Sequence, residues 1–237
     1  MNRQVPITRL RCISSMATRR LLQGLAVQYG ASAGVDITLE SVGGVDAARR
    51  VAAGESFDVV VLAGDAMAGL QASGALLPDS QAVVALSPVA IALPAGRAVP
   101  VVDTVQQLVE LLLKSERIGY STGPSGKALL ERLAGWGVLE MLRPSLVQAP
   151  PGQPVAAMVA RGEVGIGFQQ LSEMVHSPGI TLLTRVPPEA EIVTAFVAGA
   201  CASSVHEREA RVFIDFICSA ASRPAKLAEG MQPGAAG

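Results

Sequence analysis

The stretch Ala47–Leu62, AARRVAAGESFDVVVL, predicts the fold class. Its first half is an amphipathic helix that Gly54 ends, because glycine readily takes the left-handed backbone angles found just past a helix. Its second half, Asp58–Leu62, is apolar on both faces, as is typical of a central parallel strand covered by helices. Parallel strands require crossover helices, so this stretch predicts an α/β protein.

The same alternation continues in both directions along the chain. Leu10–Ser14 and Val35–Val42 are predicted strands, with a predicted helix at Met16–Tyr29 between them. The later predicted elements, in chain order, are Ala66–Ser73, Ala82–Leu93, Thr104–Lys114, Glu116–Tyr120, Gly126–Trp136, Leu146–Gln148, Val155–Arg161, Val164–Phe168, Ile180–Leu183, Ile192–Val197 and His206–Ser219. Repeated β-α-β units predict a doubly wound architecture with ligands at the carboxyl ends of the strands.

Composition excludes several classes of function. The 237 residues are 50% hydrophobic and carry a net charge of −1, so no basic footprint for nucleic acid exists. No apolar run reaches the length of a membrane span. The first eleven residues have no apolar core of a signal peptide, so we expect a soluble cytoplasmic protein, or a periplasmic one if a leader was removed.

Four segments rich in Gly, Ser and Gln lie where a predicted strand meets a helix. They are Ser14–Thr18, Ser41–Asp46, Gly119–Gly126 and Gly167–Ser172. Helix starts leave backbone N–H groups free and carry partial positive charge, so they bind anions. Each segment alone is more simply an N-cap or a tight turn. The four together predict a site for one small anionic ligand.

Several short motifs also resemble a known family. They are Ser14-Ser15-Met16, Ala48–Glu55, Pro124-Ser125-Gly126, Ala160–Gly167 and Phe213–Ser219. In this order they resemble the molybdate-binding (ModA-like) group of type 2 periplasmic binding proteins. The resemblance implies two lobes, each a mixed, mainly parallel sheet flanked by helices, with a ligand cleft between them. Lobe 1 would hold residues 1–85 and 190–237, and lobe 2 residues 86–189.

The resemblance also implies site residues, and the chain departs from the family at two of them. Ser15 matches the first ligand serine, while Ser125 and Gly152-Gln153 match positions that give backbone N–H groups. No hydroxyl stands at Gly43-Gly44, where a second serine is expected, and Gln170 replaces a tyrosine. The loss of two hydroxyls argues against molybdate. Paired amides at Gln169 and Gln170 would suit a carboxylate or a hydroxy acid.

Two functions remain open from the sequence. A smaller branch with this fold resembles aconitate isomerase, and this resemblance implies an isomerase that shifts a double bond along a di- or tricarboxylate without a cofactor or a metal. The alternative is a non-catalytic solute-binding protein for transport or sensing, whose partner would be an ABC transporter permease if a leader was removed.

An isomerase of this kind needs a base and donors for the developing charge. The catalytic candidates are Lys127 and Glu173; Glu40, Asp46 and Tyr120 are further possible bases. Arg19 is a candidate partner for a substrate carboxylate, although a surface position is the simpler explanation. The predicted ligand-binding residues are Ser14, Ser15, Arg19, Gly43, Gly44, Tyr120, Ser121, Ser125, Gly126, Gly152, Gln153, Gln169 and Gln170.

Overall fold

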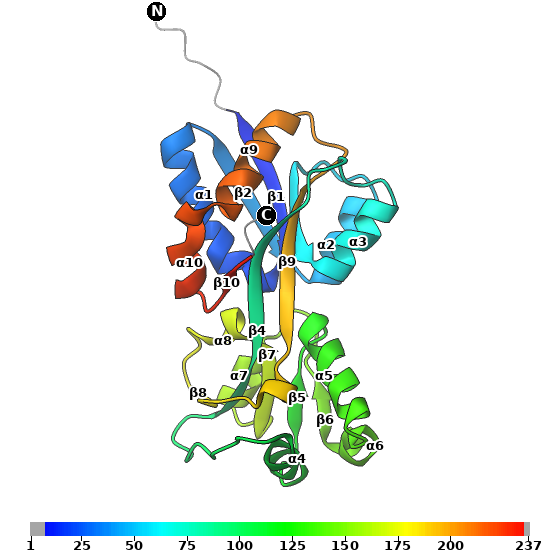
Figure 1. The fold of residues 1–237 in the computed structure, drawn as a ribbon, viewed down its shortest axis with the longest axis vertical. Helices are drawn as coiled ribbons and strands as arrows, with labels where there is room; N and C mark the ends of the chain where they lie inside the picture. The colour runs from blue at the N-terminus through cyan, green and yellow to red at the C-terminus, as the bar shows by residue number, and fades with distance from the viewer. Residues whose placement is uncertain (1–7, 235–237) are drawn as a thin grey trace, which may run out of the picture. The chain divides into compact units, whose positions relative to one another are not determined.

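The computed structural model describes residues 8–234, and the chain divides into two compact units. Unit 1 comprises residues 1–86 and 195–237, and unit 2 comprises residues 87–194. The chain passes from unit 1 to unit 2 within strand β4 (Ala82–Pro94) and returns within strand β9 (Val193–Ala200), as Figure 1 shows.

Unit 1 is a mixed sheet with helices on both faces. Besides β9 and the first part of β4, its strands and helices are β1 (Arg9–Ser15), β2 (Asp36–Val42), β3 (Val59–Ala63), β10 (Gln232–Pro233), α1 (Arg19–Ala33), α2 (Gly44–Ala52), α3 (Gly64–Ala72), α9 (Glu207–Cys218) and α10 (Arg223–Ala228). Strand β1 pairs in parallel with β2 and with β3, while β3 pairs antiparallel with β9. Short 3-10 helices occupy Met16–Thr18 and Ala220–Ser222.

The strand predicted to be buried on both faces is the centre of unit 1. Val59 and Val61 of β3 pack with residues of α1 and α9, whereas Val60 and Leu62 pack with residues of α2 and α3. In Figure 1, α1, α9 and α10 lie on one side of these strands and α2 and α3 on the other. Side chains alternate along a strand, so a strand between two helical layers must be apolar throughout.

Unit 2 repeats this plan around a second mixed sheet. Its further strands and helices are β5 (Ile118–Tyr120), β6 (Leu146–Gln148), β7 (Ile166–Gln170), β8 (Ile180–Leu182), α4 (Val105–Leu113), α5 (Pro124–Gly135), α6 (Leu139–Leu142), α7 (Val155–Ala160) and α8 (Leu171–Met174), with 3-10 helices at Arg143–Ser145 and Pro188–Ala190. Strand β5 pairs in parallel with β6 and β7, and β4 pairs antiparallel with β7 and β8. The α/β fold class is therefore confirmed.

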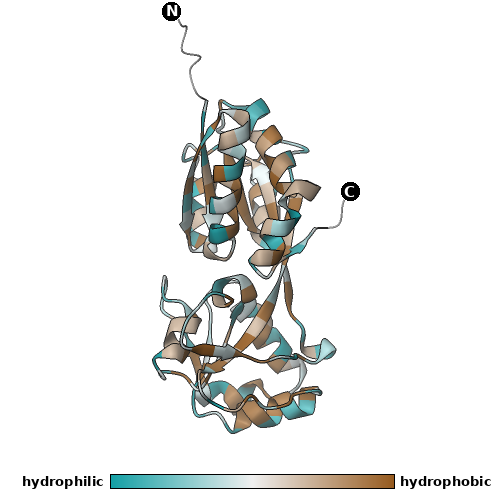
Figure 2. Ribbon diagram, turned by 90° about the vertical axis from the view of Figure 1, so that its left-hand side faces the viewer, coloured by the Kyte–Doolittle hydropathy of each residue, from teal (hydrophilic) through white to brown (hydrophobic). Residues whose placement is uncertain are grey.

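The two faces of the unit 2 sheet hold separate cores. Val89, Ile91 and Phe168 pack with residues of α4 and α5, whereas Ala90 and Ala92 pack with residues of α7 and α8. Helices of both units carry hydrophobic and hydrophilic residues along their length (Figure 2), as amphipathic covering helices do.

Several element boundaries differ from the sequence prediction, and one difference concerns the site. Strand β7 was expected at Val164–Phe168 but runs over Ile166–Gln170, because antiparallel pairing with β4 continues to the Val89–Gln170 pair. The two glutamines expected in a loop are therefore strand residues. Strand β3, expected to be a central parallel strand, is parallel to β1 on one side and antiparallel to β9 on the other.

Candidate functional site

The carboxyl end of β1 carries two buried serines. Ser14 Oγ lies 2.9 Å from Ser41 Oγ at the end of β2, so these hydroxyls bind each other. Ser15 is 8% exposed, and its Oγ has no hydrogen-bond partner among residues 8–234. A buried hydroxyl without a partner is unfavourable, so a ligand atom that binds it would gain free energy there.

The start of α2 lies beside Ser15. Gly43 is the N-cap of this helix, and a Cβ placed on Gly44 would lie 3.9 Å from the Cβ of Ser15. The first N–H groups of a helix have no partner within the helix. The structure thus brings Ser15 and Gly43–Gly44 together as neighbouring donors. Arg19, by contrast, is exposed at the start of α1.

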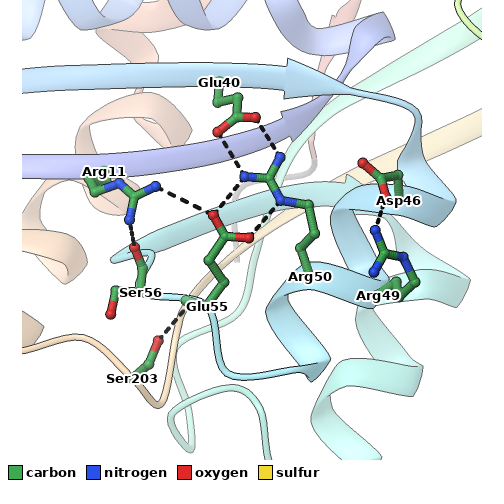
Figure 3. Close-up of polar contacts among 8 residues, drawn as sticks. All are labelled: Arg11, Glu40, Asp46, Arg49, Arg50, Glu55, Ser56 and Ser203. Carbon is green, nitrogen blue, oxygen red and sulfur yellow. Dashed lines mark hydrogen bonds and ion pairs between the residues drawn. The ribbon is translucent and has the colours of Figure 1, made fainter.

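Two acidic residues considered as bases are held in ion pairs of unit 1, drawn in Figure 3. Both carboxylate oxygens of Glu40 accept hydrogen bonds from Arg50, and this bonding lowers the pKa of Glu40. Asp46 accepts a hydrogen bond from Arg49. A paired carboxylate of lowered pKa is a weak base. Glu40 is therefore poorly suited to proton abstraction at neutral pH.

The segment between β5 and α5 forms one tight turn. Ser121 Oγ lies 2.8 Å from Ser125 Oγ and accepts a hydrogen bond from the Gly123 N–H at 3.3 Å. A Cβ on Gly126 would lie 1.8 Å from the carbonyl oxygen of Ser121, so no side chain fits there. Tyr120 is half-buried and packs against the core of unit 2. The predicted residues Ser121, Ser125 and Gly126 thus lie together in one turn, in contact with one another.

Three other predicted residues lie at more accessible positions of unit 2. The Lys127 side chain is 71% exposed, and its Nζ lies 4.0 Å from Glu131 one helical turn away. Gly152 is exposed with a φ of +79°, and the Gln153 amide donates to Glu163 Oε2 at 3.3 Å. This exposed position and the contact with Glu131 disfavour Lys127 as a base.

Gln169 and Gln170 point to opposite faces of the sheet, because adjacent strand residues alternate. Gln170 pairs with Val89, its amide nitrogen donates to Thr194 Oγ1 at 2.7 Å, and its Oε1 has no partner among the described residues. On the other face, Gln169 accepts from the Ala156 N–H at 3.2 Å. The amides expected to act as a pair are therefore separated, and Gln170 alone presents a free acceptor.

Glu173 is a half-buried acidic residue in the first turn of α8. Burial raises its pKa to about 7, while the hydrogen bond from Gln169 Nε2, at 2.9 Å, acts in the opposite direction. A carboxyl with a pKa near 7 is half ionised at neutral pH, which suits a group that takes up and returns a proton. Of the two catalytic candidates, Glu173 has this property.

The structure adds three polar residues of unit 2 that were not among the predicted ligand-binding residues, although Ser172 ends the predicted segment Gly167–Ser172. Ser87 and Ser172 are buried with hydroxyls that lack a partner among the described residues, and Thr194 binds Gln170. Ser87 and Val89 lie on one face of β4, the face that Gln170 shares. A polar residue inside an otherwise apolar strand, as at Ser87 in β4, is the sequence signal that marks such a position.

Ser15, Ser121 and Gln170 lie at the carboxyl ends of β1, β5 and β7, where open α/β sheets bind ligands. Within residues 8–234, His, Cys, Asp and Glu side chains form no group of three or more that would hold a metal ion. No helix of the same range has both the length and the apolar character needed to cross a bilayer.

An α/β fold with polar groups at the carboxyl ends of its strands is typical of ligand-binding proteins, and comparison with known proteins agrees with this. The family described as bacterial extracellular solute-binding protein matches residues 10–232, and the chain belongs to it. A curated aconitate isomerase of Pseudomonas sp. is 30% identical over 233 residues, covering 96% of this chain and 89% of that protein.

Two solved structures share the fold of a type 2 periplasmic binding protein. The periplasmic molybdate-binding protein of Azotobacter vinelandii has a TM-score of 0.78 and 18% identity, and the match covers 94% of this chain and 98% of that one. The sulfate-binding protein SubI of Mycobacterium tuberculosis has a TM-score of 0.82 and 17% identity, over 96% and 88% of the two chains.

Proposed function

We propose that the protein binds a small organic polycarboxylate and moves a double bond along it by an allylic proton shift. The observation that carries this proposal is the 30% identity to an aconitate isomerase across 96% of the chain. The solved structures, at 17–18% identity, support only the fold.

The polar groups at the strand ends support an anionic ligand. Ser15 in unit 1 has a buried hydroxyl free to donate, beside the N-terminal turn of α2. Ser125 in unit 2 lies in the first turn of α5, where N–H groups have no helical partner. Backbone N–H groups and hydroxyls bind carboxylates without a buried cation, and they stabilise negative charge that develops during a reaction.

Glu173 is the proposed base. In its ionised form it would remove a proton from a carbon beside the double bond, and the electron pair of the broken C–H bond would delocalise into the adjacent carboxylate. The neutral Glu173 would then return the proton two carbons away, which moves the double bond and restores the ionised side chain. Protons and electrons balance within the substrate and one carboxyl group.

Proton NMR in deuterated water tests this proposal. Purified protein incubated with cis- or trans-aconitate is expected to interconvert them and to incorporate deuterium. Glu173→Gln should lower the rate at least about 100-fold, since general-base catalysis contributes that much. Glu116→Gln, which changes an exposed glutamate of the same unit, should retain the rate. Full activity of Glu173→Gln would remove this residue from the mechanism.

A second candidate is solute binding without catalysis. The observation that favours it is the family itself, whose description is that of extracellular solute-binding proteins. Calorimetry then decides between the two: binding of aconitate, citrate or related acids with no exchange in deuterated water would establish a binding protein. For this second candidate an ABC transporter permease would be the partner if a leader was removed, and a cytoplasmic location stays a prediction.

A further inference from the structure

Gln169 joins two elements of unit 2 through both ends of one buried amide. Its Oε1 accepts a hydrogen bond from the Ala156 N–H at 3.2 Å, and its Nε2 donates to Glu173 Oε1 at 2.9 Å. A backbone N–H only donates, so the amide oxygen must face Ala156. The amide nitrogen must then face Glu173. Both contacts together fix the orientation of the amide, and the side chain is only 3% exposed.

The surroundings of this pair contain few charges. Strands β4 and β7 and helix α7, whose residues pack around α8, include no titratable side chain. The nearest charged residues after α7 are Arg161 and Glu163, which form an ion pair with each other. His176, two residues beyond α8, is exposed. Gln169 is therefore the polar side chain that the sheet offers to the Glu173 carboxyl.

We propose that Gln169 is a positioning residue that holds Glu173 by Oε1, so that the proton is gained and lost at Oε2. The inference rests on the proposed function. An N–H donor at Oε1 leaves no room for a proton on that oxygen, so the neutral acid carries its proton on Oε2. The bond also favours the ionised form, which keeps the base available at neutral pH. Donation from Ala156 polarises the amide and strengthens its second bond.

NMR titration of the ¹³C-labelled Glu173 side chain measures the pKa of its carboxyl group directly. Gln169→Leu removes the donor, and the pKa of Glu173 is expected to rise by roughly one unit above its wild-type value, the effect of one charge-assisted hydrogen bond. Gln169→Glu keeps an oxygen for Ala156 and places a second carboxyl beside Glu173. It should raise the apparent pKa further, since two carboxyls share a proton.

Gln106→Leu is the matched control, because Gln106 donates to Glu110 with the same spacing of four residues on the exposed face of α4. It should leave the titration of Glu173 and the isomerisation rate unchanged. If Gln169→Leu does not fold, Gln169→Glu alone decides the outcome.

The pH profile of the reaction provides the second measurement. In Gln169→Leu the acidic limb of kcat should move to higher pH with the pKa of Glu173, while KM changes little. An unchanged titration and pH profile in a folded variant would overturn the inference. A shifted titration in a protein with no isomerase activity would overturn the proposed function and leave the positioning role of Gln169 standing.

Discussion

Gly126 shows most sharply how a single residue shapes the candidate site. Any Cβ there would lie 1.8 Å from the Ser121 carbonyl oxygen, and backbone cannot yield as a flexible side chain does. Gly126→Ala should therefore open the turn, with a cost in unfolding free energy of roughly 1–3 kcal/mol. Ligand affinity should fall about tenfold, equivalent to about 1.4 kcal/mol, as the Ser125 N–H moves.

Gly123→Ala is the control for this change, because its Cβ would meet only Ser121 Oγ, at 3.8 Å. Urea unfolding and calorimetric titration compare the two variants. Equal stability and affinity in both would show that the turn tolerates a side chain at Gly126.

At this scale the sequence predicts residue types better than contacts. Serine and glycine at positions 125 and 126 were recognisable as donors of a helix start. The opposed directions of Gln169 and Gln170 were not, because two polar residues at the end of an apolar run look like a loop. Pairing with β4, an element some 80 residues away in the chain, keeps them in the strand. Ser87 and Thr194 were not predicted either, because their position beside Gln170 depends on the pairing of strands far apart in the chain.

At the scale of elements, one arginine connects strand β2, helix α2 and the segment that follows this helix. Arg50 binds Glu40 on β2 and Glu55 beyond α2, and its guanidinium lies 5.2 Å from the centre of the Phe57 ring (Figure 3 shows the ion pairs). These carboxylates raise the pKa of Arg50, and Arg50 lowers theirs. The arginine is 19% exposed, so salt screens these pairs less than fully exposed ones.

Arg50→Met should lower the melting temperature of unit 1, because Glu40 loses its ion pair and Glu55 keeps only Arg11, at 3.5 Å, while the packing of the side chain is retained. The loss should be larger than that of Arg49→Met, which removes an ion pair between side chains 70% and 46% exposed. Calorimetry of both variants at low and high salt makes the comparison. Equal melting temperatures would mean that the network adds nothing to stability.

The longer elements were predictable and the short ones were not. Periodicity locates α1, β2 and β3 within a few residues, because each buries a continuous apolar face. Helices α6 and α8 have four residues each, too few for a helical period to be visible. Strand β10 has two residues and exists through its pairing with Leu86 and Ala85 of β4.

At the scale of the whole molecule, each unit has its own cores on both faces of its sheet. Effects of a substitution on packing should therefore remain within its unit. The titration of Glu173 can show whether an effect on stability stays within unit 2.

The pKa of Glu173 is raised to about 7 in the folded protein from an ordinary value near 4.5, so the folded state binds the proton more tightly than the unfolded state.

Because the folded state binds this proton more tightly, the free energy of unfolding falls as pH rises from about 4.5 to about 7. Above pH 7 the full destabilisation by the ionised, buried Glu173 applies. A shift of this size corresponds to roughly 3 kcal/mol. Glu173→Gln removes the titrating group, so its stability should exceed that of the wild type more at pH 8 than at pH 4.5. The single tryptophan, Trp136, lies in unit 2, and its fluorescence during urea unfolding reports on that unit. Hydrogen exchange of the β3 amides reports on unit 1 and should show no such difference. A pH effect of equal size in β3 would mean that the two units unfold as one.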